Sequence, residues 1–415
     1  MKGDKLRILF LLTQDLESPL GIGRIWPLAK ELAKAGHQVR IVALHSRWRT
    51  ITERKFSKEG VAIEYVGQMH VRKVGNQKLY YSMFGLIRVA LLATWALSRA
   101  ALSESVDIIQ VCKPQPMNSI AGLLARSIRG GVLCVDCDDY EAASNRFAAE
   151  WQRKVVAFFE RIVPCIAQVV TTHTQFMWDK LIAWGCEPKR IHYLPNGVDL
   201  ERFKPPVPAT VETLRKKYRL EERAVVAFLG TLSLANHPVD LLLKAFTILL
   251  KQNPTAVLLL VGGGDDFPRL KALAHQSGIG QEVVFTGWVA PVEVPDYYAL
   301  ANISVDPVYD DDAARGRLPL KMFESWAMGV PFVTSPVGDR LRLAGDPPAS
   351  LLAEKAGDAI AFAKALQQVL NDPELAESLR QRGYLRVQDY TWDNLSKQVE
   401  RLYMDAFRTA DERKR

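Results

Sequence analysis

VVAFLGTLSLANHPVDLLLKAFTILLKQNPTAVLLLVGGGD, residues 225–265, is the stretch that indicates the architecture of this chain. Two short apolar runs, residues 225–229 and 257–261, have the length and composition of buried strands. Between them, residues 241–250 have the length and pattern of an apolar helix. A strand, a helix and a second strand at this spacing predict two parallel strands joined by a crossover helix.

The same alternation extends in both directions along the chain. Before residue 225, strand-like runs lie at 8–12, 39–44, 61–66, 108–111, 132–135 and 169–172, separated by helix-like stretches at 25–35, 79–102, 117–128 and 155–166. After residue 265, strand-like runs lie at 283–285, 303–305 and 331–333, separated by helix-like stretches at 270–275 and 322–328. This pattern predicts α/β architecture, with parallel sheets covered by helices on both faces.

A proline-rich, charged segment, residues 195–208, interrupts the alternation near the middle of the 415-residue chain. Prolines do not suit helix interiors or central strands, so this segment is interpreted as a linker between two domains. We place the first domain at residues 1–200 and the second at 201–390. The terminal helix-like stretch, residues 393–407, could pack on either domain.

Composition and charge describe a folded protein with a modest basic excess. Hydrophobic residues make up 48% of the chain, charged residues 24%, and the formal net charge is +8. This excess suits an acidic ligand or an anionic membrane surface without distinguishing them, and we expect no nucleic-acid partner. The five cysteines are odd in number and scattered, so we expect no disulfide framework, a reducing compartment and no structural metal.

The longest apolar tract, residues 79–102, has two interpretations. Arg88 and Arg99 interrupt it and make it a poor transmembrane span. The two arginines are eleven positions apart and share one helix face. Such a helix suits a membrane surface, or a protein core from which two arginines reach solvent, and we favour the core. We therefore expect a cytoplasmic protein, with peripheral contact at the inner face of an anionic membrane as the alternative.

Open α/β sheets bind ligands at the carboxyl ends of their strands, so the turns there are the candidate sites. Gly21-Ile-Gly23 follows the first strand but lacks the third glycine of a dinucleotide fingerprint. A flexible loop and an anion-binding loop are both compatible with it. The glycines at 262–264 follow the strand at 257–261 and leave room for a ligand to approach the main chain.

Residues 315–324, RGRLPLKMFE, are the most specific of these turns. Pro319 suits the first position of a helix. Lys321 would lie in the first turn, where the helix dipole repels a cation, and a bound phosphate would remove this conflict. Glu324, three residues later, shares that face and could accept hydrogen bonds from ribose hydroxyls. The alternative is an exposed lysine on a surface helix.

Several longer motifs accompany these turns. They are LPNGVDLERF at 194–203, FLGTL at 228–232, DLLLKAF at 240–246, VGGGD at 261–265, FTGWV at 285–289 and KMFESWAMGVP at 321–331. In this order they resemble the large family of retaining glycosyltransferases with the GT-B fold, the group 1 or family 4 type. The resemblance runs through nearly the whole chain. It implies two Rossmann-like, doubly wound domains that face each other across a cleft.

The activity that this resemblance implies is transfer of a sugar, of the hexosyltransferase type, from a nucleotide-sugar donor with retention at the anomeric carbon. The acceptor would be a glycan, a lipid-linked compound or a small molecule, as in cell-envelope polysaccharide biosynthesis. Glu324 corresponds to the second, ribose-binding glutamate of the family, and Lys321 lies in the loop that contacts the donor phosphates. Gly263 and Gly287 lie in loops that line the nucleotide, and Gly23 lies in the loop that closes on the diphosphate.

The resemblance also concerns the end of the chain. Residues 390–392 and the helix after them resemble the segment that crosses back to the first domain. This implies that residues 391–415 pack on the first domain.

The chain departs from the family pattern at the diphosphate. After Gly230, Thr231 stands where an arginine is usual, and Asn236 or His237 stands where a lysine is expected. Gly316 replaces the first glutamate, eight positions before the second. Residues 136–140, DCDDY, replace the usual His-Asp.

Loss of two cations from a desolvated diphosphate site should cost several kcal/mol, since charge-assisted hydrogen bonds contribute about 1.5–3 kcal/mol each. We hypothesise that the phosphate clamp has moved to Arg315, Arg317 and Lys321, with His237 adding charge when protonated. Gly230 and Thr231 remain donor-binding candidates at the start of this turn.

The departing diphosphate needs its charge neutralised by a metal ion or by fixed donors. Asp136-Cys-Asp138 has the spelling of a metal motif but adjoins a first-domain strand, and the acidic run 310–312 is interpreted as solvated. We expect no metal, no other cofactor, and activity that survives EDTA. Asp139 is expected to orient the sugar or the acceptor hydroxyl, and His173 to bind at the end of a strand. Together with Lys321 and Glu324, they are the catalytic candidates.

Three alternatives stay open. A nucleotide-sugar epimerase or a sugar phosphorylase could use the same fold, and a degenerate member could bind nucleotide or glycan without turnover. The sequence does not identify the base, the sugar, the acceptor or the oligomeric state.

Overall fold

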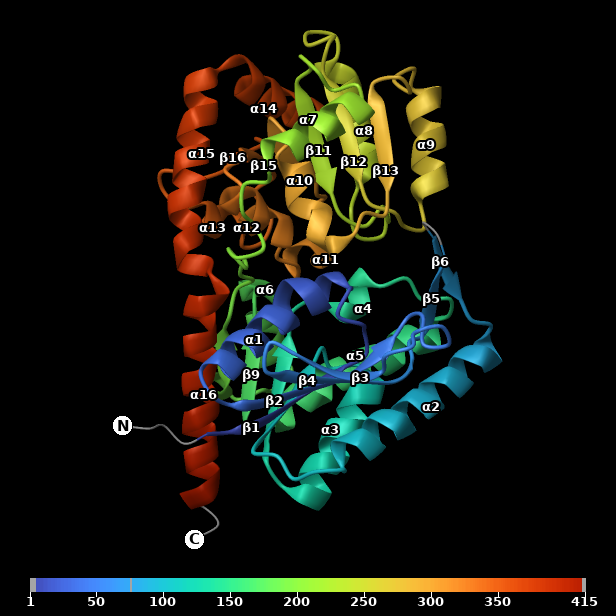
Figure 1. Ribbon diagram of the computed structural model, residues 1–415, viewed down its shortest axis with the longest axis vertical. Helices are drawn as coiled ribbons and strands as arrows, with labels where there is room; N and C mark the ends of the chain where they lie inside the picture. Colours follow the sequence, from blue (N-terminus) through green and yellow to red (C-terminus); the bar gives the residue numbers. More distant parts are fainter. Residues whose placement is uncertain (1–4, 75–76, 413–415) are drawn as a thin grey trace. The chain divides into compact units, whose positions relative to one another are not determined.

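The structure, a computed structural model, describes residues 5–74 and 77–412 (Figure 1). The chain divides into two compact units. Unit 1 comprises residues 1–73, 79–197 and 392–415, and unit 2 comprises residues 74–78 and 198–391. The main division thus falls between Gly197 and Val198, inside the proline-rich segment, and the chain returns to unit 1 at Trp392.

Unit 1 is built on an eight-stranded sheet in the order β10-β9-β8-β7-β1-β2-β4-β3. Its strands are β1 (Arg7–Leu12), β2 (Gln38–His45), β3 (Lys55–Lys58), β4 (Val61–Gln68), β7 (Ile108–Cys112), β8 (Val132–Cys137), β9 (Val169–Thr172) and β10 (Ile191–Tyr193). Only the edge strand β3 is antiparallel to its neighbour in this sheet; the other pairs are parallel. A separate two-stranded sheet consists of β5 (Val71–Val74) and β6 (Gln77–Tyr80).

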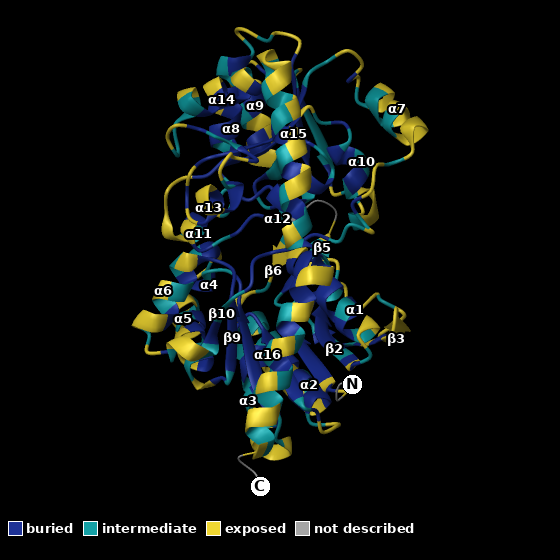
Figure 2. Cartoon of the chain, turned by 90° about the vertical axis from the view of Figure 1, so that its left-hand side faces the viewer, coloured by how far each residue is buried: buried dark blue, intermediate teal, exposed yellow. Residues whose placement is uncertain are grey.

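Helices cover both faces of this sheet because alternate strand residues point to opposite sides. Leu9 and Leu11 pack in one core with α2 (Met83–Ala101), α3 (Pro116–Arg129) and α5 (Glu150–Ile166). Ile8 and Phe10 pack in the other core with α1 (Trp26–Lys34) and α16 (Trp392–Glu412). The strands therefore lie buried between two helical layers (Figure 2). The remaining helical elements of unit 1 are η1 (Gly21–Ile25), α4 (Glu141–Ser144), α6 (Gln175–Ala183) and η2 (Pro188–Arg190).

Unit 2 contains a six-stranded parallel sheet in the order β13-β12-β11-β14-β15-β16. Its strands are β11 (Val225–Leu229), β12 (Val257–Val261), β13 (Val283–Gly287), β14 (Ile303–Asp306), β15 (Phe332–Thr334) and β16 (Leu351–Leu352). Its helical elements are α7 (Pro208–Lys217), α8 (Val239–Leu249), α9 (Phe267–Gln276), η3 (Pro291–Glu293), α10 (Val294–Tyr298), α11 (Asp312–Arg315), α12 (Leu320–Ala327), α13 (Arg340–Ala344), α14 (Ala359–Asn371), α15 (Pro373–Val387) and η4 (Gln388–Tyr390). The α/β fold class predicted from the sequence is confirmed in both units.

The sequence predicts no disulfide framework and a reducing compartment, yet one pair of cysteines is bonded. Cys165 and Cys186 form a disulfide between the end of α5 and the turn after α6. Cys112, Cys134 and Cys137 are free and buried. The two cysteines are 21 positions apart in the sequence, and this spacing does not predict that they pair.

The apolar tract before residue 102 was interpreted as a core helix, and this is wrong. Helix α2 is long and apolar enough to cross a membrane, yet only 22% of its most apolar 18-residue window is buried. Ala93, Leu97 and Ala101 face the core, while Phe84 and Leu91 are exposed. The apolar residues continue around the helix, so composition alone did not distinguish its inner face from its outer one.

Two turns also differ from their predicted form. Gly21 and Gly23 lie in η1, a π-helical turn continuous with α1, and not in a flexible loop. Pro319 is the residue before α12, one position earlier than predicted, and Lys321 is the second residue of that helix.

Helix α16 joins the end of the chain to unit 1 through buried polar contacts. Trp392 Nε1 donates to the Gly23 carbonyl at 3.0 Å, and Tyr403 Oη donates to Gln110 Oε1 at 2.7 Å. Both aromatic side chains are almost completely buried. The hydrogen bond of Tyr403 reaches the central strand β7, so it connects the last helix with the middle of the sheet.

We expect Tyr403→Phe to destabilise the protein by about 1–3 kcal/mol, because it leaves the buried Gln110 Oε1 without its donor. Denaturant unfolding measures the loss. Tyr384→Phe removes the same hydroxyl from an exposed tyrosine of α15 and should change stability by less than about 0.5 kcal/mol. Equal effects of the two substitutions would contradict the assigned role of Tyr403.

Candidate functional site

The strand order of each sheet indicates where a ligand can bind. In unit 2 the order β13-β12-β11-β14-β15-β16 reverses direction between β11 and β14. In unit 1 the corresponding reversal lies between β1 and β7. Connections on the two sides of such a point lead to opposite faces of the sheet and leave a crevice at the carboxyl ends of the strands. The candidate residues of each unit lie at these ends.

In unit 2 the reversal point contains a buried ionic cluster around Asp306, the last residue of β14. Lys321 Nζ is 2.9 Å from Asp306 Oδ1, and Arg340 binds Oδ2 through NH2 at 2.8 Å and Nε at 3.2 Å. Lys321 Nζ also lies 4.2 Å from the centre of the Phe228 ring. A Cβ placed on Gly230 would be 3.6 Å from this ammonium, so Lys321 reaches the turn after β11.

The opposite charges of this cluster stabilise one another's ionised forms. Burial favours the neutral form of Asp306, but Lys321 and Arg340 together hold the pKa of this carboxyl well below its usual range. Burial lowers the pKa of Lys321, and the Asp306 carboxylate opposes that effect. A carboxylate that holds two cations in place keeps their charge available for an anionic ligand.

His237 lies partly buried in this cluster, and the sequence predicts that it supplies charge when protonated. That expectation is wrong, because burial and the neighbouring Lys321 and Arg317 lower its pKa well below the usual value. Its Nδ1 lies 3.9 Å from Asp306 Oδ1 and has no hydrogen-bond partner within the described chain. The imidazole is therefore a neutral polar group near the start of α8.

The two arginines of the proposed clamp differ. Arg315 is exposed and binds Asp310 through Nε at 2.7 Å and NH2 at 3.0 Å, so its charge is already paired on the surface. Asp311 caps α11 through the Ala314 N–H, and the acidic run is therefore structured rather than merely solvated. Arg317 is half-buried and donates through NH1 to the Asn236 carbonyl. The structure thus keeps Arg317 and Lys321 in the cluster and removes Arg315.

The glycines after β12 allow the neighbouring turns of unit 2 to pack closely against one another. A Cβ on Gly262 would overlap the Gly230 carbonyl, and one on Gly264 would overlap the Leu232 carbonyl. Gly263 lies against the Trp288 ring, and Gly262 N–H donates to the Gly287 carbonyl at 3.0 Å. The turns after β11, β12 and β13 are therefore in direct contact. On the side where a Cβ would stand, these glycines are in contact with neighbouring backbone and Trp288.

Thr231, the residue in the place of the usual arginine, lies in the turn after β11. Its carbonyl accepts the Ser233 N–H at 3.0 Å, which closes the turn locally.

Glu324 lies on α12, one turn after Lys321. Tyr298 Oη donates to its Oε2 at 2.8 Å, and the other carboxylate oxygen receives no hydrogen bond within residues 5–74 and 77–412. Burial raises the pKa of Glu324, while Arg202 and the Tyr298 hydroxyl oppose this shift. One carboxylate oxygen is thus fixed by the protein and the other is suited to accept a ligand hydroxyl.

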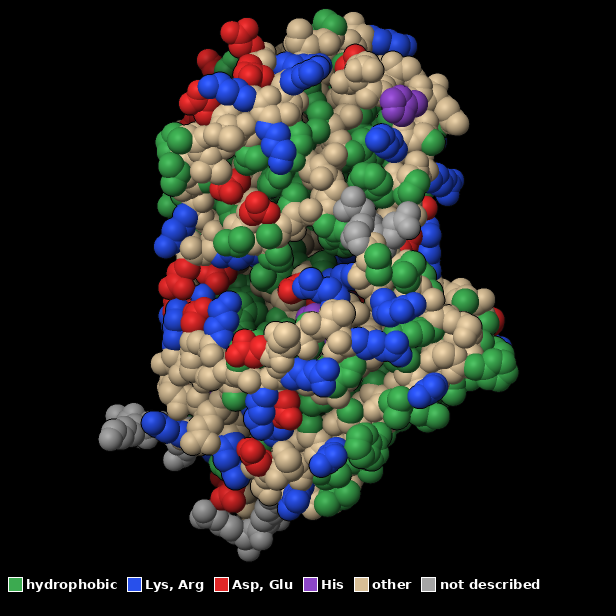
Figure 3. Space-filling view, turned by 45° about the vertical axis from the view of Figure 1, so that its right-hand side comes forward, with side chains coloured by type: hydrophobic (Ala, Val, Ile, Leu, Met, Phe, Trp, Pro, Cys, Tyr) green, Lys and Arg blue, Asp and Glu red, His purple; other side chains and the backbone are tan. Residues whose placement is uncertain are grey.

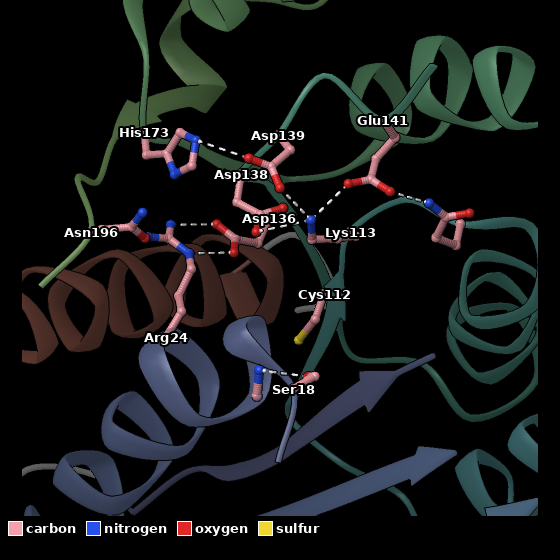
Figure 4. A network of polar contacts seen from close by, with 12 residues as sticks. Ser18, Arg24, Cys112, Lys113, Asp136, Asp138, Asp139, Glu141, His173 and Asn196 are labelled. Atoms are coloured by element: carbon pink, nitrogen blue, oxygen red, sulfur yellow. Dashed lines mark hydrogen bonds and ion pairs between the residues drawn. The ribbon is translucent and has the colours of Figure 1, made fainter. Parts of the chain in front are cut away.

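In unit 1 the reversal point contains a second network, centred on Lys113 (Figure 4). Lys113 Nζ lies 2.6 Å from Asp139 Oδ2, 2.7 Å from Glu141 Oε1 and 3.4 Å from Asp138 Oδ2. Asp138, Asp139 and Glu141 each offer an oxygen within 4.8 Å of the others, the spacing of a metal site. The lysine ammonium already points into this group and supplies a fixed cation there.

The backbone of Lys113 is unusual. Its φ is +61°, in the left-handed region that non-glycine residues rarely adopt. Asn118 Nδ2 donates to the Lys113 carbonyl at 3.0 Å and to the Cys112 carbonyl at 2.8 Å, which holds this turn. A strained residue held by buried hydrogen bonds at the end of a strand is typical of a functional position.

A buried arginine organises the opposite side of the same network. Arg24 binds Asp136 through two hydrogen bonds of 2.7 Å, and Asn196 Oδ1 accepts from its NH1 at 3.0 Å. Because Gly23 precedes Arg24 in η1, the glycine lies beside this pair rather than in an open loop. Arg24 therefore fixes the end of β8, where the stretch Asp136-Cys-Asp138-Asp139 begins.

His173 lies directly after β9, and its Nε2 is 3.8 Å from Asp139 Oδ1. Burial lowers the pKa of His173 to about 3, although the Asp139 carboxylate acts in the opposite direction. Burial, together with the carboxylates of Asp139 and Asp136, raises the pKa of Asp138 well above its usual range despite Lys113. The structure thus brings Asp139 and His173 together at the reversal point of unit 1, with His173 neutral.

Sequence reasoning missed the residues that hold these sites together. They are Arg24, Lys113 and Glu141 in unit 1, and Arg202, Tyr298, Asp306 and Arg340 in unit 2. A signal existed for two of them: Lys113 follows a buried strand immediately, and Asp306 ends one. A charged residue directly at the carboxyl end of an apolar run marks a candidate position in an open α/β sheet.

Two family models match the chain. The model described as "Glycosyl transferases group 1" matches residues 210–386, which lie in unit 2. The model described as "Glycosyl transferase 4-like domain" matches residues 22–197, which belong mainly to unit 1. Apart from Arg202, which lies between the two matched ranges, the matches include the residues named above for the two networks.

Several curated proteins similar to this chain are named as glycosyltransferases or mannosyltransferases. The chain is 32% identical over 209 residues to the GDP-mannose-dependent alpha-(1-6)-phosphatidylinositol monomannoside mannosyltransferase of Mycobacterium tuberculosis (strain ATCC 25618 / H37Rv), covering 50% of this chain and 54% of that protein. It is 32% identical over 176 residues to the mannosylfructose-phosphate synthase of Agrobacterium fabrum, covering 40% and 38%. The chain thus spans about half the length or less of these relatives.

Solved structures share the fold along almost the whole chain. Sucrose-phosphate synthase from Thermosynechococcus elongatus superposes with a TM-score of 0.77 at 20% identity, covering 97% of this chain and 100% of that one. Anabaena HepE, solved in complex with UDP and glucose, superposes with a TM-score of 0.72 at 16% identity, covering 95% and 98%. At these identities the likeness establishes the fold.

The neutral His173 predicts a dependence of stability on pH. The unfolded chain binds a proton on this histidine as the pH falls through about 6.5, whereas the folded chain binds it only near pH 3. Stability associated with this ring is therefore complete above about pH 6.5 and is lost toward acid, by at most about 1.4 kcal/mol per pH unit.

His173→Asn removes this titration. We expect the difference in unfolding free energy between wild type and variant to narrow from about pH 8 to about pH 5, measured by denaturant titration. The difference at the higher pH records the packing and polar contacts that the neutral ring makes. A difference that stays constant with pH would show that His173 is not held neutral.

Proposed function

Because the chain belongs to the group 1, family 4 type glycosyltransferases with the GT-B fold, we propose that it transfers a sugar from a nucleotide-sugar donor to an acceptor. The observation that carries this proposal is the cationic cluster at the reversal point of unit 2. There Lys321, Arg317 and Arg340 surround a single carboxylate, Asp306, in a buried setting. A surplus of fixed cations beside a helix start suits a diphosphate.

Each part of the donor has a proposed partner in unit 2. Lys321 and Arg317, which both lie in the cluster around Asp306, neutralise the diphosphate. Glu324 accepts a ribose hydroxyl through the oxygen that Tyr298 does not bind. Gly230, Thr231, Gly263 and Gly287 shape the turns around this position.

The reacting sugar and the acceptor have proposed partners in unit 1. Asp139, held by Lys113 and close to His173, orients a hydroxyl by accepting its hydrogen bond. His173 acts as a neutral hydrogen-bonding group rather than as a charged acid. We further propose that the sugar keeps its anomeric configuration, as in the retaining family that the motifs resemble.

We also propose that the reaction needs no metal ion. Lys113 places an ammonium among the carboxylates of Asp138, Asp139 and Glu141, where a divalent ion would otherwise bind. Lys321 and Arg317 supply positive charge for the leaving diphosphate.

The proposed acceptor is a glycan or a lipid-linked compound, used by a cytoplasmic enzyme that contacts the membrane peripherally. The mycobacterial relative is named for a phosphatidylinositol-linked acceptor, which supports the lipid-linked choice. The basic excess of the chain, +8, agrees with an anionic membrane surface.

A binding screen of nucleoside diphosphates, followed by hydrolysis of the matching nucleotide-sugar, tests the function directly. We expect one base to bind preferentially, its sugar donor to be hydrolysed slowly without acceptor, and the released sugar to retain its anomeric configuration by NMR. EDTA should leave the rate unchanged. Strict dependence on a divalent ion would contradict the metal-independent proposal, and tight nucleotide binding without any hydrolysis would identify a non-catalytic member.

Replacing both Lys321 and Arg317 by alanine tests the phosphate clamp. Loss of two charge-assisted contacts of about 1.5 kcal/mol or more each should weaken nucleotide binding at least about 100-fold, measured by calorimetry. Arg315→Ala is the matched control, because this exposed arginine is paired with Asp310 and should leave affinity nearly unchanged. Nearly unchanged affinity in the folded double variant would show that the phosphate is bound elsewhere.

A further inference from the structure

The outer surfaces of α2, α3 and α5 form the largest concentration of exposed hydrophobic side chains in the described chain. Thirteen of the 25 exposed large hydrophobic residues there belong to these three helices. On α2 they are Met83, Phe84, Ile87, Leu91, Leu92 and Trp95; on α3, Leu124 and Ile128; on α5, Trp151, Val155, Phe158, Ile162 and Ile166. We name these residues the apolar face of unit 1.

The three helices present this face together. They cover the same side of the sheet, α2 packs beside α3, and α3 packs beside α5. On α5 the exposed residues recur every three or four positions, from Trp151 to Ile166, so they form one stripe along the helix. Exposed apolar surface of this extent marks an interaction site rather than ordinary surface variation.

The charges around the apolar face are mainly basic. Helices α2 and α3 contain arginines but no acidic residue. Arg88 and Arg99 are exposed on α2, and Arg99 lies over the Trp95 ring. On α5, Lys154 and Arg161 are exposed, while Glu160 is buried and Glu150 is paired with Arg153. Figure 3 shows hydrophobic and basic side chains side by side at the lower right, on the side where Figure 1 places α2.

We propose that the apolar face of unit 1 is a membrane-docking surface that binds an anionic lipid bilayer. Basic side chains among exposed aromatic and aliphatic ones match the interface of such a bilayer, where cations meet headgroups and apolar groups enter the acyl boundary. A second copy of the chain is a poorer match, because a symmetric contact through this face would place arginines against arginines.

Helix α2 lies on the membrane and does not cross it. Its inner residues Ala93, Leu97 and Ala101 are buried in the core of unit 1. The helix packs directly on β4, since a Cβ on Gly67 would lie in van der Waals contact with it, 3.8 Å from the Ala96 Cβ and 3.9 Å from the Ala93 Cα. Insertion across a bilayer would expose this core, whereas docking of the outer face leaves it intact.

The peripheral membrane contact is part of the proposed function, and this inference rests on it. The inference adds the location of the contact, the apolar face of unit 1. It brings unit 1, which contains Lys113 and Asp139, to the surface where lipid-linked acceptors reside. Vesicle binding without donor or acceptor tests the surface independently of catalysis.

Sedimentation with phosphatidylcholine vesicles, with and without phosphatidylglycerol, is the test. We expect wild type to bind the anionic vesicles, and Leu91→Glu with Trp95→Glu to lower that binding at least about tenfold. Arg88→Ser with Arg99→Ser should also lower binding to anionic vesicles about tenfold or more and reduce its salt dependence. Ile360→Glu with Leu385→Glu, which alters equally exposed apolar residues of unit 2, is the matched control and should bind like wild type.

Three results would overturn the proposal. Wild type could fail to bind anionic vesicles, or the control pair could lose binding as strongly as the α2 pair. Alternatively, wild type could form a dimer that Leu91→Glu with Trp95→Glu dissociates, without any vesicle binding, which would identify a self-association surface. Donor hydrolysis that persists in any of these cases would leave the proposed function standing.

Discussion

Each unit depends on a buried aspartate at the end of a strand that a fully buried arginine binds. Arg340 binds Asp306 in unit 2, and Arg24 binds Asp136 in unit 1. Removing one partner of such a pair costs about 3–5 kcal/mol, because the other charge is left without compensation. Each arginine also donates to loop carbonyls, Arg340 to Ala314 and Val337, Arg24 to Leu194 and Pro195. The ion pairs therefore fix the loops that carry the candidate site residues.

The position of the two charged networks that contain these pairs follows from the topology of the sheets. Asp306 ends the strand beside β11, where the strand order of unit 2 reverses, and Lys113 follows the strand beside β1, where the order of unit 1 reverses. Polar groups can gather there because the crossover connections leave in opposite directions. Elsewhere along the strands, side chains of both faces are enclosed by helices, and a charge would be buried without a ligand to meet it.

The sequence predicted those features that depend on local periodicity. The alternating elements gave both sheets, and the spacing of Lys321 and Glu324 placed them on one helix. Contacts between distant segments were not predictable in this way: Asp306 meets Arg340 across 34 positions, and Lys113 meets Asp139 across 26. Burial was not predictable in this way either. The sequence predicts a charged His237, whereas burial and the neighbouring cations lower its pKa and keep the imidazole neutral. Helix α2 was assigned to the core because its sequence does not reveal which apolar side has a protein partner.

The two networks differ in the sign of their charge, and this difference suggests different ligands. In unit 2, three cations surround one carboxylate, which leaves positive charge for an anionic group such as a diphosphate. In unit 1, the carboxyl groups of Asp136, Asp138, Asp139 and Glu141 outnumber Arg24 and Lys113, and Asp138 is pushed toward its neutral form. Such a site repels phosphate and accepts hydrogen bonds from hydroxyls. These charges support, without reference to any relative, the proposal that unit 2 holds a donor by its diphosphate and that unit 1 holds hydroxyl groups.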